Sequence, residues 1–130
     1  MEHTGSKTHI TGLITVGVPV ADQERALDFY VNTLGFKTRR DAPFGPMRWI
    51  EVGPQSAAVS IALVATPTAS RLGVDTGIRL ASTDADADHA ALLAAGVDAD
   101  PEVIRMGGSV PPMFTFRDPD GNQLVVVQQP

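Results

Sequence analysis

A weak internal repeat constrains the fold of this chain more than any other feature of its sequence. An apolar, β-rich run precedes Asp22, and a helical pattern then extends to Gly35. The same succession recurs around Asp84 and Gly96. The two aspartates are separated by nearly the same number of residues as the two glycines. Such self-similarity predicts that one supersecondary unit occurs twice, and that each copy occupies about half of the chain.

The helical segments begin and end at residues with known capping roles. Asp22 and Asp84 can accept hydrogen bonds from the free amides of a first helical turn. Gly35 and Gly96 can adopt the left-handed conformation that ends a helix. Phe29 lies off the apolar stripe of the first helix, so we expect it to contact the other half of the chain. That stripe follows the i, i+3, i+4, i+7 spacing and consists of Leu27, Tyr30, Val31 and Leu34.

Short strand-like segments follow each helix, with turn residues between them. The five residues 118–122 lie between two alternating runs and indicate a hairpin. The pattern is therefore βαβββ, twice: an α+β fold with helices on one face of mostly antiparallel strands. We expect a single domain, 1–130, with modules at about 9–66 and 75–129. The strands expected after the helices are 36–40, 47–52, 57–65, 102–106, 113–117 and 123–128.

The composition excludes several classes of protein. With 43% hydrophobic and 19% charged residues the chain is a globular domain, and without cysteine it has no disulfide, thiolate metal site or cysteine nucleophile. A net charge of -5, no basic cluster and 5% aromatic residues argue against a nucleic-acid partner. No apolar stretch reaches the roughly 18 residues of a membrane span. Residues 1–7 read as a frayed leader without a signal-peptide core, so we expect a cytoplasmic location and no membrane partner.

Four stretches of sequence carry a family resemblance: VADQERALDFY (20–30), LGF (34–36), AAGV (94–97) and FRDPDGN (116–122). They are spread over nearly the whole chain. Together, in this order, they resemble the vicinal-oxygen-chelate superfamily, the group of glyoxalases, bleomycin resistance proteins and extradiol dioxygenases. The resemblance implies two tandem βαβββ modules whose curled mixed sheets enclose a cleft. It also implies a homodimer, because members of the superfamily commonly pair.

The chemistry of this superfamily usually needs a divalent metal held by cleft-facing side chains. The resemblance places the three usual ligand positions at Thr15, Gly77 and Val125. A fourth position, used by many members, falls in 57–65, which contains no Asp, Glu or His. Thr, Gly and Val cannot supply the imidazole and carboxylate ligands that such a metal needs. We therefore expect no metal and no other cofactor, as in the branch of the superfamily that binds drugs without transforming them.

Strand alternation assigns the residues that line the expected cleft. Ile78 and Leu80 should face the helix, which leaves Arg79 for the cleft, and Trp49 and Glu51 take the cleft side of their strand. A mainly apolar cavity with few polar groups is typical of small-molecule sites. The alternatives are a core or interface position for Trp49 and a structural ion pair for Arg79. The predicted ligand-binding residues are Thr15, Met47, Trp49, Glu51, Arg79, Met113, Thr115 and Val125.

The sequence thus favours a metal-independent small-molecule-binding protein of the glyoxalase/bleomycin-resistance type, including one that sequesters its ligand. No catalytic residue is assigned. The alternative is a lyase, isomerase or dioxygenase of the superfamily. It would use an unrecognised metal site, or acid–base chemistry by Glu51 with Arg79 as electrostatic stabiliser. A third interpretation is a domain that serves association with another protein.

Overall fold

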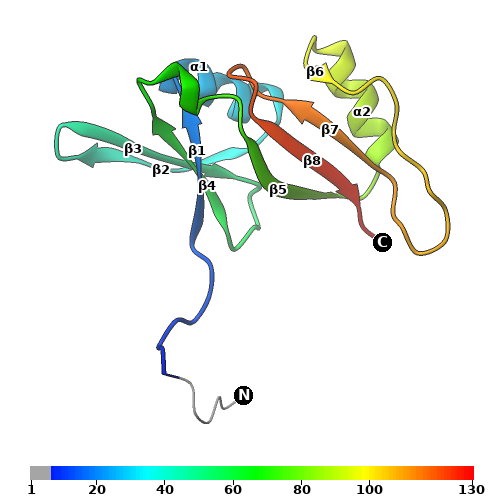
Figure 1. Ribbon diagram of the computed structural model, residues 1–130, viewed down its shortest axis with the longest axis horizontal. Helices are drawn as coiled ribbons and strands as arrows, with labels where there is room; N and C mark the ends of the chain where they lie inside the picture. Colours follow the sequence, from blue (N-terminus) through cyan, green and yellow to red (C-terminus); the bar gives the residue numbers. More distant parts are fainter. Residues whose placement is uncertain (1–6) are drawn as a thin grey trace.

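Two four-stranded mixed sheets make up the computed structural model, which describes residues 7–130; most of the expected leader lies outside the described residues. The first sheet has the strand order β1-β4-β3-β2 and the second has the order β5-β8-β7-β6 (Figure 1). Two neighbouring pairs run parallel, β1 with β4 and β5 with β8, which are the first and last strands of each module along the chain. All other neighbouring strands run antiparallel. The predicted α+β fold of two tandem βαβββ modules is confirmed, and both sheets are open at their edges.

The first module contains one helix that changes from an α-helix to a π-helix half-way along its length. The Asp22 carboxylate accepts hydrogen bonds from the amides of Glu24 and Arg25, at 3.0 and 3.1 Å. The α-helix then continues as a π-helical turn, and the chain leaves it at Gly35 with a φ of 79°. The capping roles predicted for Asp22 and Gly35 are confirmed. The elements are β1 (Thr15–Val20), α1 (Gln23–Asp28), the π-helix η1 (Phe29–Thr33), β2 (Lys37–Phe44), β3 (Met47–Gly53) and β4 (Ser60–Ala65).

The second module repeats this order with the same end signals. Asp84 accepts a hydrogen bond from the amide of Ala87 at 3.0 Å, and Gly96 follows the helix with a φ of 79°. No helix within residues 7–130 combines the length and the apolar character needed to cross a membrane. The elements are the 3-10 helix η2 (Ala69–Arg71), β5 (Asp75–Ser82), α2 (Ala85–Ala94), β6 (Asp98–Ala99), β7 (Met113–Arg117) and β8 (Gln123–Gln128).

The prediction of a strand at 102–106 is wrong. Only Ile104 pairs there, in an isolated bridge to Met113, and the regular pairing with β7 lies earlier, at β6. Five residues, from Asp100 to Ile104, lie opposite only three of β7, so the chain bulges out of the ladder. Pro101 lies in this bulge and has no N–H to donate to a ladder.

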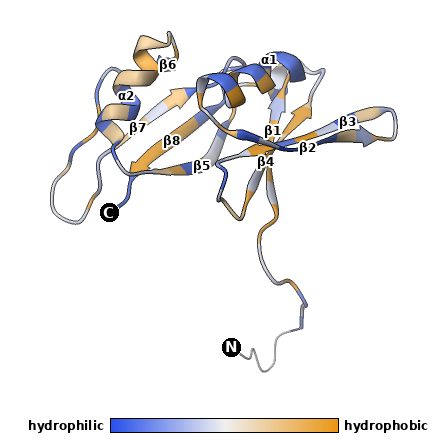
Figure 2. Cartoon of the chain, turned by 180° about the vertical axis from the view of Figure 1, so that it is seen from behind, coloured by the Kyte–Doolittle hydropathy of each residue, from blue (hydrophilic) through white to orange (hydrophobic). Residues whose placement is uncertain are grey.

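The apolar core continues from one module into the other. The ring of Phe29 lies 6.3 Å from that of Phe116 in β7, which confirms that Phe29 contacts the other half of the chain. The two aromatic side chains belong to one buried cluster, and Figure 2 shows apolar residues along α2, β7 and β8 of the second module. Burying each such side chain contributes roughly 1.5–3 kcal/mol. The largest fully buried apolar side chains are Tyr30, Phe114, Phe116, Ile50, Leu63, Leu124, Val18, Val20 and Val52.

A buried hydrogen-bond network joins the two modules at the turn between β7 and β8. The Tyr30 hydroxyl donates to Asp118 Oδ2 at 2.9 Å, and Asn122 Nδ2 donates to the same oxygen at 2.9 Å. Asn122 Nδ2 also donates to the Pro19 carbonyl at 2.8 Å, and Asn122 Oδ1 accepts from the Val74 amide at 3.0 Å. Burial, with the nearby Asp118 carboxylate, raises the pKa of Tyr30 far above its ordinary value, so the hydroxyl keeps its proton.

We predict that Asn122→Ala lowers the free energy of unfolding by about 3 kcal/mol, because Asn122 is fully buried and its loss leaves polar groups without partners. Chemical denaturation followed by circular dichroism measures the change. Asn32→Ala is the matched control: Asn32 is exposed, bonds only its helical neighbour Asp28, and should cost below about 0.5 kcal/mol. Equal losses in both variants would contradict a special role for the network.

Candidate functional site

Burial alternates along the central strands and defines an open face on each sheet. On β3, Ile50 and Val52 are fully buried in the core, while Trp49 and Glu51 between them are only partly buried. Arg79 is exposed on β5, between two residues that pack against the core. The faces away from the core are called here the first and second open faces. The first carries Thr15, Met47, Trp49, Glu51 and Ser60; the second carries Arg79, Met113, Thr115 and Val125.

A polar cluster lies in the middle of the first open face. Trp49 Nε1 donates to Glu51 Oε2 at 2.7 Å, and Ser60 Oγ donates to Glu51 Oε1 at 2.5 Å. Thr15 Oγ1 in turn donates to the Ser60 carbonyl at 3.0 Å. Each carboxylate oxygen therefore has a donor. Ser60 was missed as a functional residue; its one signal in the sequence is that it interrupts the apolar run at 57–65.

These contacts keep Glu51 ionised. The hydrogen bonds from Ser60 and Trp49 lower the pKa of Glu51 below its ordinary value, and the positive charges of Arg40 and Arg39 add to the effect. A carboxylate with a lowered pKa and both oxygens occupied is a weak general base. The contacts therefore argue against Glu51 as a proton acceptor.

A small cavity of about 220 Å³ lies beside the indole of Trp49, at the β2–β3 hairpin. The ring of Phe44 lies 5.9 Å from that of Trp49, at an angle of 51°, and is 65% exposed. The remaining walls come from Arg40, Ala42 and Pro43. Sequence reasoning missed the residues of β2 here, because the strand was expected to end at residue 40 and instead extends to Phe44.

Arg79 lines a different cavity, of about 670 Å³, in the seam between β5 and the first sheet. Its contact within hydrogen-bonding distance is the Gly77 carbonyl at 3.5 Å, and it takes part in no ion pair with a residue of 7–130. Arg79, Val125 and Thr115 are neighbours across β5, β8 and β7. The predicted site residues thus form two groups, one on each sheet. Glu51 and Arg79 do not share a cavity, which argues against their acting as a catalytic pair.

The three positions where the superfamily holds its metal do not fit one here. Thr15 uses its hydroxyl to hold the Ser60 carbonyl, Gly77 has no side chain, and Val125 is apolar. Among residues 7–130, no three His, Asp or Glu side chains are grouped so that they could bind a metal ion. The donor set at these positions therefore does not match a divalent metal.

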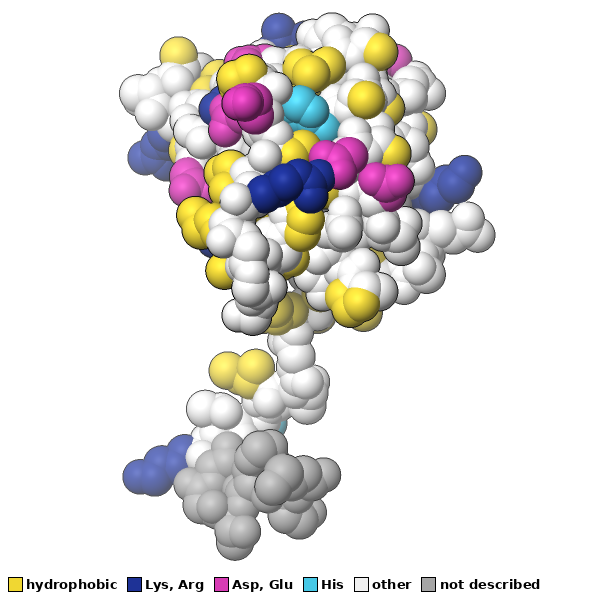
Figure 3. Space-filling model, turned by 90° about the vertical axis from the view of Figure 1, so that its right-hand side faces the viewer, with side chains coloured by type: hydrophobic (Ala, Val, Ile, Leu, Met, Phe, Trp, Pro, Cys, Tyr) yellow, Lys and Arg dark blue, Asp and Glu magenta, His cyan; other side chains and the backbone are white. Residues whose placement is uncertain are grey.

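The charged face around α2 is a structural surface. His89 Nε2 lies 2.7 Å from the Asp100 carbonyl, and its ring packs edge-on against Phe114 at 4.9 Å. Arg117 bonds Asp100 at 2.7 Å, and Arg105 pairs with an aspartate of α2. Figure 3 shows acidic and basic side chains side by side on this face. His89 is a packing residue.

Comparison with known proteins identifies similar chains. The family model "Glyoxalase/Bleomycin resistance protein/Dioxygenase superfamily" matches residues 9–126. The uncharacterized protein YetH of Bacillus subtilis (strain 168) is 32% identical over 118 residues, which cover 86% of this chain and 93% of YetH. The match to YurT of the same organism is shorter: 42% identity over 38 residues, 29% of this chain and 30% of YurT. The structure of TnmS3, an antibiotic binding protein from Streptomyces sp. CB03234, has a TM-score of 0.80 and 35% identity, covering 95% of this chain and 99% of TnmS3.

We predict that the stabilising effect of Glu51 disappears in acid. Because the pKa of Glu51 in the folded state lies below its ordinary value of 4.5, its carboxylate stabilises the fold above that value, and the effect is lost as the pH falls through the folded pKa. The difference in unfolding free energy between wild type and Glu51→Gln should therefore stay constant from pH 7 down to 4.5 and shrink as the pH falls below 4.5. Denaturant titrations at several pH values measure it. Glu102→Gln, at an exposed position, is the control and should give a smaller difference at pH 7; differences of equal size would contradict the role of the Trp49–Glu51–Ser60 cluster.

Proposed function

Because the chain belongs to the glyoxalase/bleomycin resistance protein/dioxygenase superfamily, we propose that it binds a small molecule without a metal and sequesters it unchanged. The observation that carries the proposal is the cavity lined by Trp49 and Phe44 at the end of the first open face. Two aromatic rings beside a polar cluster are typical of small-molecule recognition, where apolar contact supplies affinity and a few polar groups set orientation. We propose that this binding takes place in the cytoplasm.

Two further observations support binding over catalysis. The side chains at Thr15, Gly77 and Val125 are no set of metal ligands, and Glu51 is placed as a hydrogen-bond acceptor rather than a base. TnmS3, which shares the fold over almost its full length at 35% identity, is described as an antibiotic binding protein. The likeness to a binding protein supports the proposal that this chain binds and sequesters its ligand.

We predict that Trp49→Ala weakens the binding of a neutral aromatic probe by about 1 kcal/mol or more, about fivefold, because it removes one wall of the cavity. N-phenyl-1-naphthylamine, whose fluorescence rises in apolar sites, is the probe. Its dissociation constant is measured for wild type and variant, and circular dichroism shows whether the fold is kept. Leu93→Ala is the control, since Leu93 is an exposed apolar residue on α2, away from the cavity. Equal effects of both substitutions would contradict a site at Trp49. Collapse of the fold in Trp49→Ala would identify Trp49 as a core residue.

We predict that the purified protein contains far less than one metal ion per chain. The reason is the donor set at Thr15, Gly77 and Val125. Elemental analysis for Zn, Ni, Mn and Fe on protein prepared without chelators is the measurement. One equivalent of any of them, removed together with an activity, would overturn the proposal in favour of an enzyme.

We also propose that the chain forms a homodimer, in which the second copy covers exposed apolar side chains outside the cavity beside Trp49. Single sheets with helices on one side leave apolar side chains in solvent, and Met47 is 51% exposed. The segment before β1 adds Ile10, Leu13 and Ile14, each exposed by more than three-quarters. Light scattering after size exclusion should give twice the mass of one chain. A monomer at micromolar concentration would contradict this.

A further inference from the structure

We propose that the cavity beside Trp49 selects planar ligands that carry an anionic group, and that Arg40 is the residue that binds this group. The proposal rests on the proposed function, because it assigns a ligand class to the same cavity. Glu51 is the one carboxylate among the predicted site residues, and considered alone it would favour a cationic ligand. The proposal of an anionic ligand differs from that expectation. The reasons lie in how the charges of the β2–β3 hairpin are paired.

Arg40 lines the cavity with its guanidinium unpaired. It lies directly across from Glu51 in the β2–β3 ladder, on the strand that supplies Pro43 and Phe44 to the cavity. No hydrogen bond or ion pair within residues 7–130 involves its side chain. A guanidinium carries five N–H donors in one plane, and all five are available to a bound molecule.

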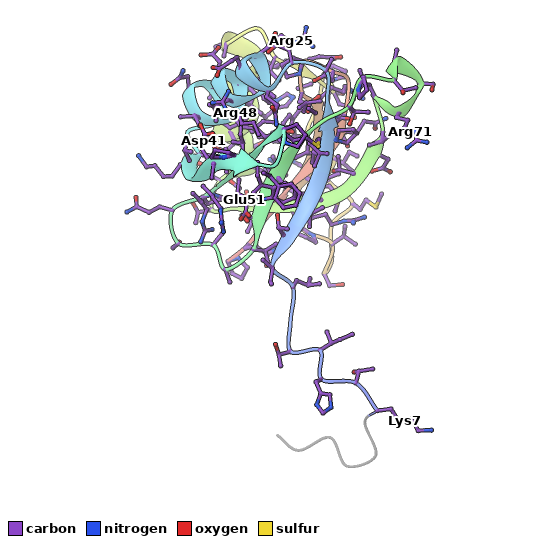
Figure 4. All side chains as sticks on the ribbon, turned by 90° about the vertical axis from the view of Figure 1, so that its left-hand side faces the viewer. Lys7, Arg25, Asp41, Arg48, Glu51 and Arg71 are labelled. Atoms are coloured by element: carbon purple, nitrogen blue, oxygen red, sulfur yellow. The ribbon has the colours of Figure 1, made fainter. Side chains whose placement is uncertain are left out.

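The other arginines of the hairpin have partners. Arg48 pairs with Asp41 at 2.7 Å and with Glu24 of α1. Asp41 and Arg48 lie on the α1 side of the hairpin, and Glu51 lies on the opposite side (Figure 4). Arg39 bonds the Ala57 carbonyl. Asp41 is thus occupied on the far side of the sheet and does not neutralise Arg40.

Glu51 is nearby but forms no ion pair with Arg40. Its two oxygens accept hydrogen bonds from Trp49 and Ser60, at 2.7 and 2.5 Å. The charge of Arg40 acts on Glu51 through space, without an ion pair between them. A ligand that enters the cavity therefore meets free donors from Arg40, beside a carboxylate that already accepts one hydrogen bond at each oxygen.

The size and shape of the cavity limit what the uncharged part of the ligand can be. Its volume of about 220 Å³ is below the roughly 300–1,000 Å³ of sites for drug-sized molecules, so it takes one or two fused rings, or the end of a larger molecule. The rings of Trp49 and Phe44, tilted by 51°, offer two aromatic surfaces to a planar group. A carboxylate or sulfonate on that group matches the planar fork of Arg40, which can donate two parallel hydrogen bonds.

Three naphthalenes of nearly equal size separate charge from ring contact: 2-naphthoate, 2-naphthamide and 2-naphthylmethylammonium. Isothermal titration calorimetry on the full chain measures each dissociation constant. We expect 2-naphthoate to bind about tenfold more tightly than 2-naphthamide, because hydrogen bonds to a charged group are the stronger ones. Arg40→Gln should reduce 2-naphthoate to about the affinity of the amide and weaken the amide itself much less, because the amide carries no charge. Arg79→Gln, at the other cavity, should change neither.

Each other result overturns the inference in a recognisable way. Equal affinities for the three compounds, with binding still dependent on Trp49, would remove the role of Arg40 and leave the proposed function standing. Tightest binding of the ammonium compound would assign the charge preference to Glu51. Failure of every naphthalene and of N-phenyl-1-naphthylamine would overturn the ligand class and the proposed site together. Arg40→Lys, which keeps the charge and loses the planar fork, gives a second test: an undiminished preference for 2-naphthoate would contradict a two-bond contact.

Discussion

The buried carboxylate of Asp118 is the interaction on which the arrangement of the two modules depends. A buried charge is costly unless several donors hold it. Asp118 receives four: the Tyr30 hydroxyl, the Asn122 side chain, and the amides of Asp120 and Asn122. These donors belong to η1 and to the β7–β8 turn, and Asn122 also bonds the chain at β1 and ahead of β5. The Asp118 carboxylate is therefore fully hydrogen-bonded only when the ends of both sheets are in place at the same time.

This junction lies on the core side of the sheets, whereas the cavity beside Trp49 lies on the opposite face of the first sheet. On the first open face the polar groups satisfy each other, since Glu51 accepts from Trp49 and from Ser60. A tryptophan held by such a bond presents its ring in one orientation before any ligand arrives. Binding to a preorganised ring avoids the loss of conformational freedom that ordering a mobile side chain would cost. The fold thus supplies a rigid sheet, and its side chains determine what the sheet recognises.

The proposed function separates a superfamily scaffold from the metal chemistry usual for it. The positions that hold a metal in other members lie on the open faces here, with side chains suited to other purposes. Thr15 supports the backbone of Ser60, and Val125 lies between Arg79 and Thr115 in the second sheet. None of these changes disturbs a core residue, because each position faces away from the core. A fold of this kind can lose one activity and keep its stability, since function depends on the site and not on the architecture.

The sequence by itself determined the features that depend on near neighbours: the repeat, the aspartates and glycines that end each helix, and the alternation that separates Ile50 and Val52 from Trp49 and Glu51. These follow from backbone geometry within a few residues. Only the tertiary structure decided that residues 102–106 form a single bridge at Ile104 in place of a strand, that β2 reaches Phe44, and that Arg40 lines the cavity of Trp49 while Arg79 lines another. Those outcomes depend on which strands pair and in what register. Register is set by contacts between residues far apart in the chain, and no local pattern contains that information.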